Sequence, residues 1–144
     1  MTDELYTLLN KPKWTKIRIA TKRAQIEDLH LMMLPSGIRY DKESVQSSPS
    51  DPMMKFIEKL SDLESDLKAL EKSYTEQYTE VEKLIKKLDD ARLEEIVTLR
   101  YLVGYDPKDI ATAMGYAESW VHKLHRDAIK ELEAVGGYKE DSKK

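Results

Sequence analysis

Helical spacing places Glu118, His122 and His125 on adjacent positions of one predicted helix, and these side-chain types can bind a metal ion. Three such ligands without a fourth are weak grounds for a zinc site, so we expect no metal and no cofactor. His30 stands alone, and there is no glycine-rich phosphate loop, no serine–histidine–aspartate arrangement in a recognisable context and no paired-carboxylate motif. These residues predict a binding protein rather than an enzyme.

The stretch from Pro107 to Arg126 has the spacing of two helices joined by a tight turn. Asp106 can cap the first helix, Pro107 suits its first turn, and Gly115 can adopt a positive φ where the chain reverses. A small residue, a glycine four positions later and a valine six further on match the register of a DNA-binding helix-turn-helix. Apolar spacing alone does not exclude an ordinary helical hairpin. The buried positions are expected at Ile110, Ala111, Met114, Val121, Leu124, Ala128 and Leu132.

Residues 91–103 predict a further helix, which ends at Gly104 and provides the scaffold that a three-helix DNA-binding unit requires. The residues expected to face the helix-turn-helix are Ile96, Leu99 and either Tyr101 or Val103. We therefore predict a helix-turn-helix domain over residues 89–135. Residues 136–144 are polar and predict a disordered tail.

Residues 1–88 predict a helical hairpin or coiled coil, with a linker over residues 35–52 where turn-forming residues dominate. A helix is expected from about Trp14 to Leu34. Apolar residues in 53–88 follow nearly a 3.5-residue repeat, which is typical of a coiled coil. So narrow a stripe needs a partner, either the preceding helix in antiparallel fashion or a second copy of the chain. The stripe consists of Phe56, Leu60, Leu63, Leu67, Leu70, Tyr74, Tyr78, Val81, Ile85 and Leu88.

The composition favours an all-helical protein, because the 144 residues include only 5 glycines and 5 prolines and few β-branched runs. The absence of cysteine excludes disulfides and thiolate metal sites. No apolar run approaches the length of a membrane span, and no signal peptide opens the chain. We expect a cytoplasmic protein without membrane contact.

The charge distribution argues against strong, autonomous DNA binding, since phosphate contact needs local positive charge. The net charge is −3, and residues 89–138 carry 6 basic and 10 acidic side chains. Residues 11–23 hold six basic residues and no acid. That run is either the solvated face of a packed helix or a contact for nucleic acid or an acidic partner.

Residues 91–134 resemble the C-terminal helix-turn-helix of bacterial primary sigma factors, which reads the −35 promoter element. From about Ile17 to Leu132, the chain resembles small phage and prophage proteins of Gram-positive bacteria. In these proteins, which include the ArpU- and RinA-type late transcription regulators and related uncharacterised phage proteins, a coiled-coil half precedes a sigma-like helix-turn-helix. The sigma resemblance is carried by Leu99, Arg100, Tyr101, Gly104, Ile110, Ala111, Met114, Gly115, Tyr116, Trp120, Val121, Leu124, Ala128, Ile129 and Leu132.

This resemblance implies that the second helix of the motif enters the major groove of double-stranded DNA. Lys123 and Arg126 would donate to guanine edges or phosphates. Glu118 would accept from cytosine or repel phosphate, while the remaining polar side chains would meet bases or backbone. Sigma-type members usually carry more arginine and lysine on this helix. The outward positions, which are the candidate DNA-binding residues, are Ala117, Glu118, Ser119, His122, Lys123 and Arg126.

Two functions follow as hypotheses. The first is a phage-type transcriptional regulator that binds DNA and forms a homo-oligomer, as a dimer through residues 53–88. The second is a protein-interaction module that binds RNA polymerase or a phage packaging or regulatory protein without touching DNA. The outward face of residues 117–130 holds Lys123, Arg126 and Lys130 against Glu118 and Asp127, which favours DNA only slightly.

Overall fold

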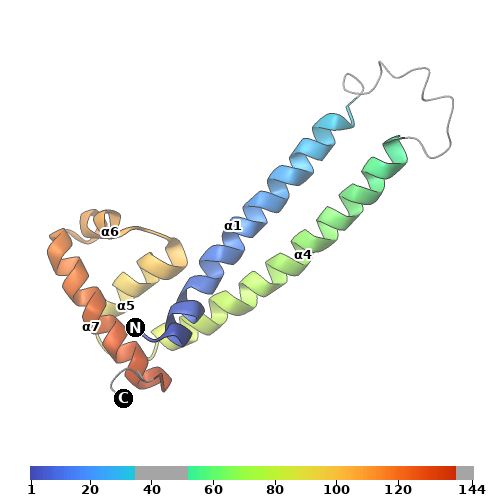
Figure 1. Ribbon diagram of the computed structural model, residues 1–144. Helices are drawn as coiled ribbons and strands as arrows, with labels where there is room; N and C mark the ends of the chain where they lie inside the picture. The colour runs from blue at the N-terminus through green and yellow to red at the C-terminus, as the bar shows by residue number, and fades with distance from the viewer. Residues whose placement is uncertain (35–51, 139–144) are drawn as a thin grey trace. The chain divides into compact units, whose positions relative to one another are not determined.

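The computed structural model describes residues 1–34 and 52–138, and every regular element within these ranges is helical. The chain forms two compact units, Met1–Trp14 with Tyr74–Lys144, and Thr15–Ser73. The all-helical fold class is therefore confirmed over the described residues. In chain order the elements are α1 (Asp3–Met32), α4 (Pro52–Ile85), α5 (Ala91–Val97), the π-helical segment η2 (Thr98–Val103), α6 (Pro107–Met114) and α7 (Glu118–Gly136) (Figure 1).

Helix α1 begins at Asp3, so the prediction that this helix starts near Trp14 was wrong. The backbone N–H of Leu5 donates to the Thr2 hydroxyl at 3.2 Å, which satisfies one donor of the first turn. Pro12 lies inside the helix, where proline removes a backbone hydrogen bond. Because Leu9 and Leu5, about one and two turns earlier, are fully buried, tertiary packing holds the helix together across the proline.

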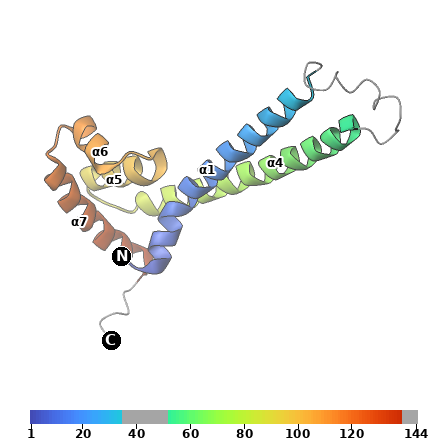
Figure 2. The ribbon, with the colours of Figure 1, turned by 45° about the horizontal axis from the view of Figure 1, so that its top comes forward.

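Within the unit Thr15–Ser73, α1 and α4 run side by side and antiparallel, as Figures 1 and 2 both show. Lys22 lies 3.8 Å from the Asp66 carboxylate, and Arg23 lies 3.0 Å from that of Glu71. Of the two partners considered for the apolar stripe of α4, the preceding helix of the same chain lies along it here. The stripe residues of this unit are half-buried, and they are Phe56, Leu60, Leu63, Leu67 and Leu70.

The other unit has one hydrophobic core, to which all of its helices contribute. Leu9 of α1 and Val81 of α4 are buried in the same cluster as the residues of α5, α6 and α7. For this reason the structure divides the chain elsewhere than at the predicted boundary after residue 88. The buried cluster contains Leu5, Leu9, Val81, Leu84, Ile85, Leu88, Leu93, Ile96, Val97, Tyr101, Leu102, Ile110, Ala111, Val121, Leu124, Ala128, Ile129 and Leu132.

Two predicted helix ends need correction. The helix predicted over 91–103 does end at Gly104, but its second half, Thr98–Val103, is π-helical, which apolar spacing did not indicate. The predicted tail from residue 136 is wrong at its start: α7 includes Gly136, and Tyr138 packs half-buried against the core. Residues 139–144 and most of the predicted linker, 35–51, lie outside the described part of the chain.

Candidate nucleic-acid interface

A short helix and a tight turn precede the candidate interface, and both have well-defined caps. A carboxylate oxygen of Asp106 accepts a hydrogen bond from the backbone N–H of Asp109 at 2.9 Å, and Pro107 occupies the first turn of α6. Gly115 ends α6 with φ 73°, in the left-handed region that glycine adopts without steric cost. The predicted cap, first turn and chain reversal are all confirmed.

The buried face of α7 follows the predicted stripe. Val121 and Leu124 are each 2 % exposed, and Ala128 and Leu132 are fully buried. From α6, Ile110 and Ala111 are buried in the same core. The small side chain of Ala111 lets the two helices approach closely. This packing fixes which side of α7 faces solvent.

A hydrogen bond links η2 to the inner side of α7. The Tyr101 hydroxyl lies 2.7 Å from Nε2 of His125, and the two rings lie 5.7 Å apart between centroids. Burial is the largest cause that lowers the pKa of His125 to about 4, with Arg100, His122 and Arg126 adding repulsion. His125 is therefore neutral at neutral pH and part of the scaffold. Burial raises the pKa of Tyr101, so its hydroxyl keeps its proton.

The structure places all six candidate DNA-binding residues on the exposed side of the turn and of α7: Ala117, Glu118, Ser119, His122, Lys123 and Arg126. Three of them are already engaged in pairs within α7. Lys123 lies 2.9 Å from the Asp127 carboxylate, and this hydrogen bond is the largest cause that lowers the pKa of Asp127. Nε2 of His122 lies 3.7 Å from the Glu118 carboxylate. The positive charge of Lys123 is thus offset locally.

Two further cations of α7 lack such a partner. Arg126 and Lys130 are exposed and one helical turn apart, and neither forms an ion pair with any residue that the structure describes. They also line an open hollow of about 450 Å³ together with Ile129 and Glu133. Arg126 and Lys130 are therefore the positions of α7 best able to contact a phosphate.

Trp120 is an exposed residue of α7 that the predicted set of DNA-binding residues does not include. It is 38 % exposed, and the Lys123 ammonium lies 5.7 Å from the centroid of its ring. The sequence does contain a signal for this exposure. Trp120 directly precedes the first buried position of α7, Val121, so its ring falls at the edge of the buried stripe and not within it. The exposed side of α7 thus carries a large apolar ring beside its polar side chains.

A metal site at Glu118, His122 and His125, which the sequence supports only weakly, gains no support from the geometry. His125 is bonded to Tyr101, while His122 is paired with Glu118. Among the described residues, no group of three or more possible ligands gathers in one place.

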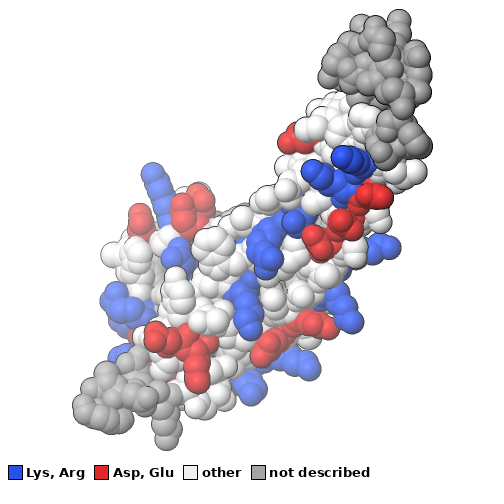
Figure 3. Space-filling model, turned by 45° about the vertical axis from the view of Figure 1, so that its right-hand side comes forward, with Lys and Arg blue, Asp and Glu red and all other residues white. Residues whose placement is uncertain are grey.

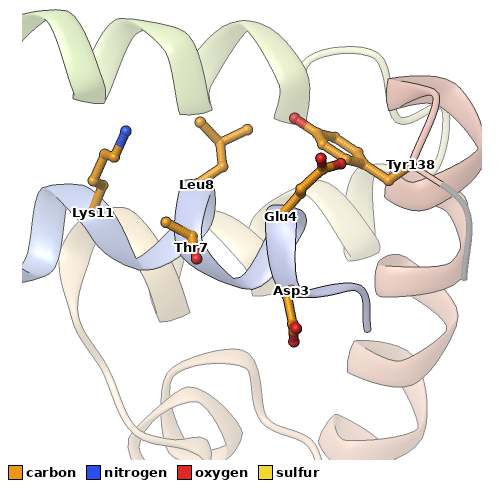
Figure 4. Close-up of a pocket in the computed structure, with 6 residues that line it drawn as sticks. All are labelled: Asp3, Glu4, Thr7, Leu8, Lys11 and Tyr138. Atoms are coloured by element: carbon orange, nitrogen blue, oxygen red, sulfur yellow. The ribbon is translucent and has the colours of Figure 1, made fainter. Parts of the chain in front are cut away.

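A second hollow, of about 530 Å³, lies at the N-terminal turns of α1 and beside Tyr138 (Figure 4). The side chain of Glu4 extends toward the Tyr138 ring, while that of Asp3 points to the other side of α1. Lys11 lies at the far end of the labelled group. This hollow is open and its lining mixes both signs of charge, so its lining does not indicate one class of ligand.

The charge pattern is mixed on the one face of the molecule that Figure 3 draws. On the face drawn in Figure 3, basic and acidic side chains are interspersed and do not form one continuous field.

Comparison with known protein families, curated proteins and solved structures finds no match for this chain. None of the described helices combines the length and the apolar character that a membrane crossing needs.

Proposed function

We propose that this protein is a cytoplasmic, phage-type transcriptional regulator that binds double-stranded DNA through a sigma-like helix-turn-helix and acts as a dimer. The helix-turn-helix would consist of α6, the turn at Gly115 and α7. One observation carries the proposal: α7 is held by its buried stripe in a fixed orientation behind a glycine turn, with its polar side chains exposed. This division of faces is what a helix that enters the major groove requires.

The charges on α7 limit its binding to DNA to a few contacts. Arg126 and Lys130 are available for phosphate or guanine, whereas the Lys123 charge is offset by Asp127. With so few cations a single copy would bind weakly. A dimer doubles the contact and raises the effective concentration of the second α7, so the two helices together bind more tightly than either alone.

The alternative is an interaction module that binds RNA polymerase or another regulatory protein. Its support is the exposed ring of Trp120 together with the acidic side chains Asp127 and Glu131 on α7. Exposed tryptophan is typical of the centre of protein interfaces. An acidic rim would suit a basic protein surface better than a phosphate backbone.

Binding of the full-length protein to phage and host promoter fragments, measured at about 50 mM salt, tests the proposal. Arg126→Ala and Lys130→Ala should each weaken binding and reduce the slope of log affinity against log salt by about one. Lys72→Ala, which removes an exposed lysine of α4, is the matched control and should leave the slope unchanged. No binding to any fragment would reject DNA reading.

Capture of partners from host lysate separates the two functions. Partners that disappear after nuclease treatment are bridged by nucleic acid and support DNA binding. Partners that persist after nuclease treatment, but are lost in Trp120→Ala, support the interaction module. Ile57→Ala, which removes an exposed apolar side chain from α4 and leaves α7 unchanged, is the control for a general loss of surface apolarity.

A further inference from the structure

The unit Thr15–Ser73 has a very thin core. Among its described residues only Thr15, Ile19 and Leu29 are buried, all of them on the side of α1 that faces α4. A pair of helices has no third layer to cover its remaining faces. Exposed apolar residues in this unit are therefore candidates for burial against another molecule.

The opposite side of α1 carries an apolar line with an internal symmetry. Ile17, Ala24 and Leu31 follow one another at intervals of seven residues, so they share one face of the helix. Ile17 is 46 % exposed and Leu31 is 55 % exposed. Ala24, midway between them, is exposed and has a small side chain that allows another helix to approach closely. We call Ile17, Ala24 and Leu31 the outer line of α1.

We propose that two copies of this chain associate through the outer line of α1, with the two α1 helices antiparallel and a two-fold axis at Ala24. That axis brings Ile17 of one copy against Leu31 of the other, twice. A two-fold interface must be self-complementary, and a line that is symmetric about its small central residue meets this condition. A parallel arrangement would instead set Ile17 against Ile17 and Leu31 against Leu31.

The charges beside the outer line select the antiparallel direction. Lys16 flanks its first half, and Glu27 and Asp28 flank its second half. None of these three side chains forms an ion pair with a described residue, in contrast to Lys22, which α4 engages through Asp66. An antiparallel partner places the basic half of one helix beside the acidic half of the other, whereas a parallel partner places like charges together.

This inference deepens the dimeric part of the proposed function and rests on it, but it uses no property of α7. Sedimentation and light scattering of the full-length protein, without DNA, therefore test it separately from DNA reading. If the protein is a dimer but binds no promoter fragment, the proposed function is rejected and the proposed interface is kept. A protein that binds promoter DNA but is monomeric up to high micromolar concentration would overturn the interface.

Ala24→Glu is the first variant. Its new side chain points to solvent in the single chain, and glutamate favours helix, so the fold should persist while the dimer is lost. Ala69→Glu, at an exposed position of α4, is the matched control and should remain dimeric. Far-ultraviolet circular dichroism of both variants confirms folding. A dimer that survives Ala24→Glu overturns the proposal.

Introduced cysteines can determine the relative direction of the two α1 helices in the dimer, because the natural chain has no cysteine. Ala24→Cys should form an intermolecular disulfide under mild oxidation, because the two-fold axis brings the two copies of residue 24 together. A mixture of Ile17→Cys and Leu31→Cys should form the mixed disulfide in preference to either homodimer. Preferential cross-linking of Ile17→Cys to itself would overturn the antiparallel arrangement.

Discussion

The hydroxyl of Tyr101 lies 2.7 Å from Nε2 of His125 and joins the π-helical segment to the inner side of α7. No ionised group takes part in this bond, since the pKa of His125 is lowered to about 4 and that of Tyr101 is raised. The contact fixes the rotation of α7 beside its buried stripe. It also gives stability a pH dependence that can be measured.

We predict that stability falls as the pH drops from about 6.5 toward 4. In the unfolded chain His125 takes up its proton near pH 6.5, whereas the folded pKa is about 4, so acid favours the unfolded state within this window. After allowance for solvent screening, the loss should be on the order of 1–2 kcal/mol. Urea denaturation at pH 7, 5.5 and 4.5 measures it.

His125→Gln is the reference for that experiment, because glutamine keeps a polar side chain that does not titrate. Carboxylates elsewhere in the chain also respond to acid, and the difference between wild type and variant removes their contribution. If both proteins lose stability equally between pH 7 and 4.5, burial of a neutral His125 is not the cause.

Replacement of Gly115 by alanine should destabilise the protein by about 1–2 kcal/mol, because φ is 73° at this position. A Cβ there would meet nothing within 4 Å, so the cost arises from backbone strain and not from a clash. Gly115→Asn is the matched comparison and should cost less, because asparagine tolerates left-handed backbone. Equal losses measured by chemical denaturation would contradict the strain explanation.

Asp127→Asn should raise affinity for DNA of any sequence. The substitution removes a negative charge from α7 and frees the Lys123 ammonium, which now lies 2.9 Å from the Asp127 carboxylate. Glu131→Gln is the control, since it removes an equal charge from α7 but leaves the Lys123 pair in place. Fluorescence anisotropy with a duplex of random sequence should show a larger gain for Asp127→Asn. A smaller gain, or a loss, would count against DNA as the partner of this face.

Val121→Ala should lower the stability of the fold and leave the preference among DNA sequences unchanged. Val121 is 2 % exposed, so the truncation leaves a cavity beneath α7 and should cost roughly 1–3 kcal/mol. Thermal unfolding measures this cost, and the preference among promoter sequences should stay the same at temperatures where the variant is folded. A changed sequence preference in a fully folded variant would mean that Val121 contacts the ligand directly.

The pattern of apolar residues was enough to predict α6, its glycine turn and the buried side of α7. These features depend on local chemistry: Asp106 caps a helix next to it in sequence, and Val121, Leu124 and Ala128 follow helical periodicity. The exposure of the six candidate residues on and before α7 follows from the same periodicity. Their contact with DNA remains a prediction.

Only the tertiary structure decided the features that depend on residues far apart in the sequence. Helix α1 continues through Pro12 because Leu5 and Leu9 are buried in the same hydrophobic cluster as Val81 of α4, and no local rule accounts for that burial. The link from Tyr101 to His125 and the separation of the chain into two units arise in the same way. Periodicity in one segment shows which face is apolar, but the partner that covers it is determined by the packing of the whole chain.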